Sequence, residues 1–154
     1  MPIFLVRHAH AGSRSTWIDD DTIRPLSPRG EAQSRIIAER LAAHAPSVLW
    51  SSPYLRCVST LEPLAELTGL TVVCENRLAE DTPLEKSLAV LDDAPDNAVL
   101  CSHGDVIPDV VNALIRRGMD VDAAMRSPRK GSVIVLHHVN KLFTHAEYWE
   151  RPEV

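Results

Sequence analysis

The sequence lacks the features that mark membrane, secreted and nucleic-acid-binding proteins. No apolar run approaches the roughly 18 residues of a membrane-spanning helix, and the apolar run at residues 3–6 is too short for a signal peptide. An excess of basic residues is also missing, because 16 Lys and Arg stand against 21 Asp and Glu, for a formal net charge of −5. Binding to nucleic acid requires a net basic surface. We therefore expect neither a membrane nor a nucleic acid as partner.

Cysteine is scarce, and the three that occur show no CxxC spacing of the kind found in metal and redox motifs. They are Cys57, Cys74 and Cys101. Cys74 and Cys101 lie in apolar, strand-like runs, so we expect both to be reduced thiols in the core. Reduced thiols are typical of a reducing compartment. The sequence therefore predicts a cytoplasmic protein.

Internal repeats, low-complexity stretches and long linkers rich in Pro, Gly or Ser are absent too. The chain has 154 residues, of which 45% are hydrophobic and 24% are charged. This length and composition suit one ordinary globular core. We expect a single domain over residues 1–154.

Short apolar runs alternate with stretches of helical periodicity along the chain. Strands are predicted at residues 3–6, 48–51, 71–74, 98–101, 132–137 and 142–149, the last two joined near Asn140. Helices are predicted at residues 28–45, 55–67, 84–91 and 105–117. Ser27 and Pro28 are suited to the first helix start, and Pro63 should bend or divide the second helix. The alternation favours an α/β fold, a three-layer sandwich with a mostly parallel central sheet.

Residues used in phosphate chemistry follow three of the predicted strands. They are Arg7-His8 after the first strand, Arg56 beyond the second, and His103-Gly104 after the fourth. Ligands bind beyond the carboxyl ends of parallel strands, so these side chains should converge. Guanidinium groups match tetrahedral oxyanions, and Gly104 would let backbone N–H groups at the next helix face an anion. The pattern predicts a phosphate site.

A neutral imidazole can attack phosphorus directly, which splits phosphoryl transfer into two easier steps through a phosphohistidine. The charges of Arg7 and Arg56 would favour the neutral form of His8. A carboxyl group at the rim of the site would then protonate the leaving group.

The motifs Arg7-His8-Ala9, Ser52-Pro53-Tyr54-Leu55-Arg56-Cys57 and Ser102-His103-Gly104 resemble those of the histidine phosphatase superfamily in order and spacing. The segment at residues 24–30 resembles the short branch of SixA-type phosphohistidine phosphatases. Arg129-Lys130-Gly131-Ser132 is similar to the phosphatase-like half of some bacterial two-domain Nudix hydrolases. The resemblance implies a phosphoglycerate mutase-like fold and a phosphatase that needs no metal or other cofactor.

The resemblance also implies roles for single residues. His8 would be the nucleophile, and Arg7, Arg56 and His103 would hold the phosphate. The substrate would be a phosphohistidine on a protein, or else a small phosphorylated metabolite such as a phosphomonoester or nucleotide.

Three further positions carry less specific expectations. Arg24 and Gly104 would contact phosphate or substrate, although Arg24 could instead pair with an aspartate of the run at residues 19–21. Glu80 lies where larger members of the superfamily keep a catalytic glutamate and would be the general acid, with Asp81 as its rival.

Two other classes of function fit part of the pattern. His8 and His10 could form a metal site with His103 and Asp105, as in a metallohydrolase. The nearby arginines disfavour this because they would repel a cation, which leaves His10 at the rim of the site. The chain could also be a phosphate-binding module without catalytic activity.

Overall fold

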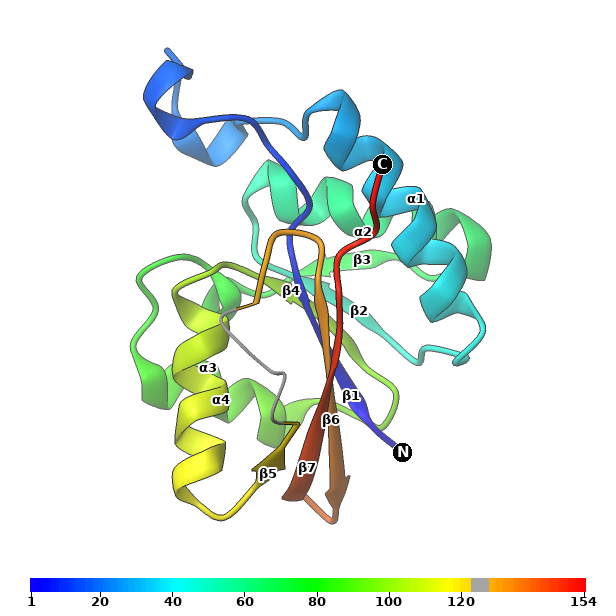
Figure 1. Ribbon diagram of the computed structural model, residues 1–154, viewed down its shortest axis with the longest axis vertical. Coiled ribbons are helices and arrows are strands. Elements are labelled where there is room, and N and C mark those ends of the chain that lie inside the picture. The colour runs from blue at the N-terminus through cyan, green and yellow to red at the C-terminus, as the bar shows by residue number, and fades with distance from the viewer. Residues whose placement is uncertain (123–127) are drawn as a thin grey trace.

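The computed structural model describes residues 1–122 and 128–154. Its seven-stranded sheet has the order β3-β2-β4-β1-β6-β7-β5 (Figure 1). The strands are β1 (Ile3–Arg7), β2 (Leu49–Ser51), β3 (Val72–Cys74), β4 (Val99–Ser102), β5 (Asp120–Val121), β6 (Val133–Val139) and β7 (Leu142–Trp149). Neighbouring strands pair in parallel except along β6, which is antiparallel to both β1 and β7. The predicted mostly parallel sheet is confirmed.

Two pairs of helices cover the two faces of this sheet (Figure 1). They are α1 (Pro28–Ala42) with α2 (Leu55–Thr68), and α3 (Leu84–Asp93) with α4 (Val106–Arg116). Side chains alternate between the faces along β1: Phe4 and Val6 pack with α1 and α2, whereas Ile3 and Leu5 pack with α3 and α4. The prediction of three layers is therefore confirmed. None of the helices in the described residues is long and apolar enough to cross a membrane.

The boundaries of α1 and α2 follow from local chemistry. Ser27 caps α1 by accepting a hydrogen bond of 3.1 Å from the Gly30 N–H. The helix ends at Ala42 rather than the predicted residue 45, where Ala45 takes a positive φ of 50°. Pro63 does not divide α2, which continues to Thr68 and ends where Gly69 adopts a left-handed conformation.

The edges of the sheet differ most from the sequence-based prediction. β5 was not predicted, because two residues carry no periodicity. The prediction for Cys74 is wrong: Cys57 and Cys101 are buried, but Cys74 is exposed. It lies on β3, which is at the edge of the sheet and pairs only with β2 among the described strands. An apolar strand at an edge exposes side chains that a central strand would bury.

The hairpin between β6 and β7 turns near Asn140, as predicted. Asn140 and Lys141 both have positive φ, 48° and 69°. This pair of left-handed residues is the tight connection that matches the twist of two antiparallel strands. The reversal places the start of β6 beside the end of β1, since Val133 pairs with Val6.

Candidate active site

A cleft of about 610 Å³ opens at the edge of the sheet where β1 and β4 end. Arg7 and Ser102 are paired residues at the ends of these two strands. The cleft lining includes Arg7, His8, Arg24, Arg56, Glu80, Asp81 and Gly104. His103 lies against His8, with the two ring centroids 5.5 Å apart. The residues predicted from the sequence as a phosphate site are thus brought together, while their individual roles stay predictions.

His8 is held as a neutral imidazole with one nitrogen free. Its Nδ1 lies 2.9 Å from the carbonyl oxygen of Ala9. Because a carbonyl can only accept, Nδ1 carries the proton and Nε2 keeps its lone pair. Burial lowers the pKa of His8 well below its usual value of 6.5; the hydrogen bond to the Ala9 carbonyl opposes this in part, and His103, Arg56 and Arg7 lower the pKa further. An imidazole in this state is suited to attack an electrophile.

The loop that carries His8 is held by hydrogen bonds from two sides. The Ala9 N–H donates to Thr60 Oγ1 of α2 at 3.0 Å, and this hydroxyl donates in turn to the Arg56 carbonyl at 2.7 Å. From the other side, the Gly131 N–H donates to the carbonyls of Arg7 and His8 at 3.1 and 3.0 Å. The nucleophile and the second arginine therefore share one rigid support.

Arg56 is a fully buried side chain. Its Nη1 donates to the Asp21 carbonyl at 2.8 Å, and its Nη2 donates to Asp21 Oδ2 at 3.1 Å and Glu80 Oε1 at 2.9 Å. Burying a charge is costly unless it is paired. These two carboxylates provide the pairing and fix the guanidinium at the floor of the cleft.

Gly104 makes room for Arg7. A Cβ at position 104 would lie 2.5 Å from Arg7 Cζ and 2.6 Å from Nη2. The guanidinium is held in this place by a hydrogen bond of 2.6 Å from Nη1 to the Pro128 carbonyl. The sequence indicated a role for the backbone N–H of Gly104, whereas in the structure the Arg7 guanidinium occupies the space that a side chain at position 104 would need.

Three buried nitrogen atoms of the cluster lack a hydrogen-bond partner among the described residues: Arg7 Nε, Arg56 Nε and His103 Nδ1. The other ring nitrogen of His103 is hydrogen-bonded to Ser52 Oγ at 2.8 Å. Buried polar groups without partners are rare in proteins and cost free energy. Their gathering beside His8 is the arrangement expected where an oxyanion is to be bound.

Glu80 is nearer the cluster than Asp81. Its Oε1 accepts hydrogen bonds from Arg14 Nη2 at 2.7 Å and Arg56 Nη2 at 2.9 Å, and lies 3.6 Å from His103 Nδ1. Asp81 has a positive φ of 62°, and its N–H donates to Asp105 Oδ2 at 2.8 Å. Glu80 is thus the carboxylate that contacts the predicted phosphate site, and the role of either residue as the acid stays a prediction.

For Arg24 the sequence left two roles open, a contact with substrate and an ion pair with a nearby aspartate, and its position in the structure is compatible with both. It lines the cleft, and its guanidinium is also paired with Asp21, at 3.0 Å from Nε to Oδ1. Nη1 donates to the Ala11 carbonyl at 2.6 Å. A contact of Arg24 with substrate stays a prediction.

Three further charged residues were assigned no role in the site from the sequence, although the run that contains Asp21 was named as a possible partner of Arg24. Asp21 pairs with Arg14, Arg24 and Arg56; burial raises its pKa, but these hydrogen bonds and charges outweigh burial and lower the pKa overall. Arg14 and Lys130 both line the cleft. Burial and the charges of the surrounding arginines lower the pKa of Lys130. Its only sequence signal is the segment at residues 129–132, which was noted without a role.

The alternative metal site is not assembled. His10 Nδ1 is hydrogen-bonded to Ser27 Oγ at 2.6 Å, at the start of α1. His10 is not part of the cleft lining, and Asp105 binds the backbone of Asp81. Among the described residues, His8, His10, His103 and Asp105 do not form a group with metal-ligand spacing.

Comparison with known proteins identifies the family. The model of the histidine phosphatase superfamily (branch 1) matches residues 3–82, more than half of the chain. The chain therefore belongs to the histidine phosphatase superfamily, as its motifs and fold indicated.

Individual relatives agree with this assignment. The 8-oxo-(d)GTP phosphatase of Mycolicibacterium smegmatis is 32% identical over 157 residues, which cover 98% of this chain and 48% of that protein. This chain thus spans about half the length of that relative.

The structure of the protein histidine phosphatase SixA complexed with tungstate superposes with a TM-score of 0.74 at 19% identity, covering 98% of this chain and 96% of the other. A mycobacterial glucosyl-3-phosphoglycerate phosphatase complexed with VO3 gives a TM-score of 0.74 at 18% identity, covering 98% and 99%. The two structures are evidence of the shared fold.

Proposed function

We propose that this chain is a metal-independent phosphatase that works through a phosphohistidine on His8. The observation that carries the proposal is the free Nε2 of a neutral, buried His8 beside three buried nitrogen atoms that have no hydrogen-bond partner in residues 1–122 and 128–154. A nucleophile and the donors for an oxyanion are thus available at one place, and membership of the histidine phosphatase superfamily supports the same chemistry.

The first step transfers the phosphoryl group to the enzyme. His8 Nε2 forms a bond to phosphorus while the bond from phosphorus to the leaving group breaks. Arg7, Arg56 and His103 donate to the equatorial oxygens, which carry the growing charge in the transition state. The Glu80 carboxylate, which accepts hydrogen bonds from Arg14 and Arg56 in the structure, takes up a proton from solvent as the substrate binds and passes it to the leaving group.

The second step releases phosphate. The Glu80 carboxylate takes a proton from a water molecule, the water oxygen bonds to phosphorus, and the bond from phosphorus to His8 Nε2 breaks. His8 returns to its starting state, with Nδ1 still donating to the Ala9 carbonyl, and Glu80 releases the proton to solvent.

The proposed substrate is a phosphohistidine on a protein. The imidazole leaving group is easier to displace than an alkoxide, so this substrate makes the smaller demand on Glu80. Similarity in fold to the protein histidine phosphatase SixA supports the choice.

A second candidate is a small phosphorylated molecule such as a nucleotide. A relative that matches 98% of this chain at 32% identity is an 8-oxo-(d)GTP phosphatase. Arg14, Arg24 and Lys130 also line the cleft beyond the three residues proposed to hold the transferred phosphate. These extra cations would suit a substrate with more than one phosphate.

The test of the mechanism is to trap the phosphoenzyme. Brief incubation with a ³²P-labelled phosphoramidate or aryl phosphate, followed by denaturation at alkaline pH, should leave label on the wild-type protein and none on His8→Ala. His44→Ala, at an exposed histidine remote from the cleft, is the control and should label normally. Turnover should also resist chelators and be inhibited by vanadate. Wild-type activity in His8→Ala would refute the mechanism.

The substrate is tested by a panel at equal concentration: a phosphohistidine peptide, nucleotides, sugar phosphates and an aryl phosphate. A kcat/KM at least tenfold higher for the phosphohistidine peptide supports the first candidate. A nucleotide preference of that size supports the second. Phosphate binding without turnover of any substrate would instead identify a binding module.

A further inference from the structure

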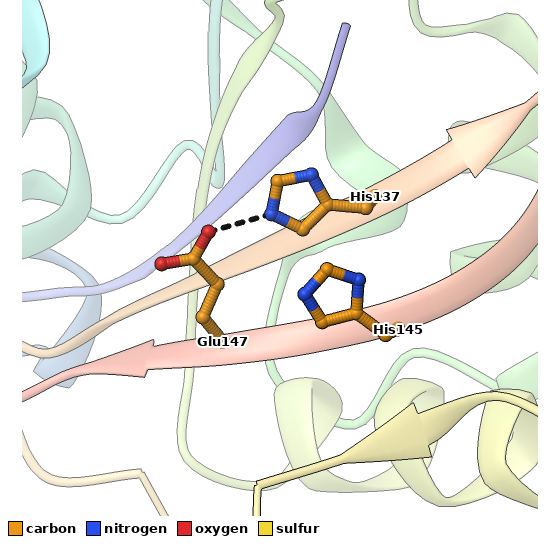
Figure 2. Close-up of side chains that lie close together, drawn as sticks. All are labelled: His137, His145 and Glu147. Atoms are coloured by element: carbon orange, nitrogen blue, oxygen red, sulfur yellow. Dashed lines mark hydrogen bonds and ion pairs between the residues drawn. The ribbon is translucent and has the colours of Figure 1, made fainter.

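A second cluster of chemically active side chains lies outside the cleft, on strands β6 and β7. Its members are His137, His145 and Glu147 (Figure 2). His137 and His145 are directly opposite each other in the antiparallel ladder. Glu147 lies diagonally across from His137, two residues after His145 on the same strand, so all three side chains project from one face of the hairpin.

The cluster is at the other end of the sheet from His8. Along the pairing of β1 with β6, Val133 lies opposite Val6, and Leu136 lies opposite Ile3. His137 comes one residue later, beyond the amino end of β1, whereas His8 follows its carboxyl end. Its chemistry is therefore separate from that of the proposed phosphatase.

The potential ligand atoms already converge. His137 Nε2 lies 2.6 Å from Glu147 Oε1, and one ligand atom from each of the three residues lies within 4.8 Å of the others. The nitrogen and oxygen ligands of a tetrahedral zinc ion are each about 2.0–2.2 Å from the metal, which places two ligands about 3.3 Å from each other. The three atoms are thus within about 1.5 Å of the separations that such an ion requires.

The arrangement contains more than an ion pair. A hydrogen bond between His137 and Glu147 does not need the ring of His145, yet the two imidazoles stack face to face with centroids 4.3 Å apart. In Figure 2 both rings extend from the hairpin toward the Glu147 carboxylate. The other oxygen of this carboxylate accepts a hydrogen bond from Trp149 Nε1 at 3.4 Å. Such outer contacts orient metal-binding carboxylates in known sites.

The charge nearby also suits a cation. Asp120 on β5 is the parallel-ladder partner of His145, so a second carboxylate stands on the next strand. Two imidazoles with carboxylate oxygen form a donor set typical of zinc and related divalent transition metals, and not of calcium or magnesium.

We propose that His137, His145 and Glu147 bind one divalent cation of the zinc type, with water completing the coordination. The ion joins β6 to β7 across the hairpin. Because it binds the folded hairpin and not the unfolded chain, it raises the stability of the protein as its concentration exceeds the dissociation constant. It takes no part in phosphoryl transfer.

The experiment uses tag-free protein of residues 1–154, dialysed against chelator and then titrated with ZnCl₂ by calorimetry, with thermal unfolding followed in parallel. One equivalent should bind, and Zn²⁺ should raise the Tm. His145→Gln and Glu147→Gln should each weaken binding at least tenfold and abolish the rise in Tm. His10→Gln removes a histidine that is hydrogen-bonded to Ser27 at the start of α1, away from the cluster, and should bind like the wild type.

Titration with Co²⁺ gives an independent readout, since coordination by imidazole and carboxylate produces visible absorption bands that His145→Gln should lose. The proposal is overturned if the wild type shows no saturable one-equivalent binding. It is equally overturned if His145→Gln binds Zn²⁺ like the wild type, which would place the ion elsewhere, for example at His8 and His103. Failure of either kind leaves the phosphoenzyme test unaffected.

Discussion

Gly104 has a larger influence on the candidate site than its size suggests, because Arg7 occupies the space where a side chain would be. In Gly104→Ala the new methyl group would displace the Arg7 guanidinium. The obstructing atoms are the far end of a flexible side chain, so the Tm should change little. Loss of one aligned donor should reduce kcat/KM by about 10- to 100-fold, or roughly 1.4–2.7 kcal/mol. Steady-state kinetics and thermal unfolding measure both effects.

A double-mutant cycle isolates the cause. If Gly104 acts through Arg7, the variant with both Arg7→Ala and Gly104→Ala should be no less active than Arg7→Ala alone. Additive losses would contradict this explanation and give Gly104 its own contact with phosphate.

Glu80 allows a second prediction at the same scale, because the need for an acid depends on the leaving group. Glu80→Gln should slow hydrolysis of alkyl phosphates far more than hydrolysis of phosphoramidates. Asp81→Asn is the matched control, since Asp81 is the neighbouring carboxylate that also lines the cleft. The measurement is kcat/KM of each variant for both substrate classes. If Glu80→Gln slowed alkyl phosphates and phosphoramidates by the same factor, Glu80 would not be the acid.

At the residue scale, the sequence predicted the gathering of His8, Arg7 and Arg56 because each follows a strand of recognisable pattern. It could not predict that Asp21 pairs with Arg56, 35 positions away in the sequence. The segment that contains Arg14 and Asp21 forms only short 3-10 turns. Its contacts depend on tertiary structure that no periodicity records.

At the scale of single elements, α2 supports the loop that carries His8 through Thr60. Thr60→Val keeps the shape of the side chain but leaves the buried Ala9 N–H without an acceptor. A buried unsatisfied donor costs about 1–3 kcal/mol, so stability should fall by this amount. The activity should fall as well, because His8 moves with Ala9. Urea unfolding and kcat/KM are the two measurements.

Thr68→Val is the control within the same helix, since Thr68 Oγ1 donates to the Leu64 carbonyl just as Thr60 Oγ1 donates to that of Arg56. It should leave kcat/KM unchanged. If both variants affected activity equally, a general effect on α2 would explain the result, and the specific link to Ala9 would be refuted.

The elements themselves were predictable where periodicity was strong, as for α1, α4 and the central strands. Cys74 shows where prediction from sequence patterns fails. An apolar strand has the same pattern at the edge of a sheet as at its centre, and only the order β3-β2-β4 determines that Cys74 is exposed. Strand order depends on the packing of helices over the whole sheet, which local sequence does not encode.

For the molecule as a whole, the buried neutral His8 should make stability depend on pH. Its pKa in the folded state is well below 6.5, whereas the unfolded chain takes up a proton near pH 6.5. Below that pH the unfolded state binds more protons than the folded state. The free energy of unfolding therefore decreases as the pH is lowered, by up to about 1.4 kcal/mol per pH unit, until the pH reaches the folded-state pKa. His8→Asn should therefore lose less stability than the wild type between about pH 7 and pH 5. Urea unfolding across this range tests it; identical slopes would mean that His8 is not held neutral.

The reversed direction of β6 decides which connections of the chain can influence substrate size. Because β6 runs antiparallel to β1, its first residue lies beside the end of β1, and residues 128–132, which lead into β6, bring Lys130 to the cleft. Residues inserted between positions 128 and 132 would cover the cleft and restrict it to smaller substrates. Residues inserted in the turn at Asn140 would lie at the opposite end of the strands and leave access to the cleft unchanged.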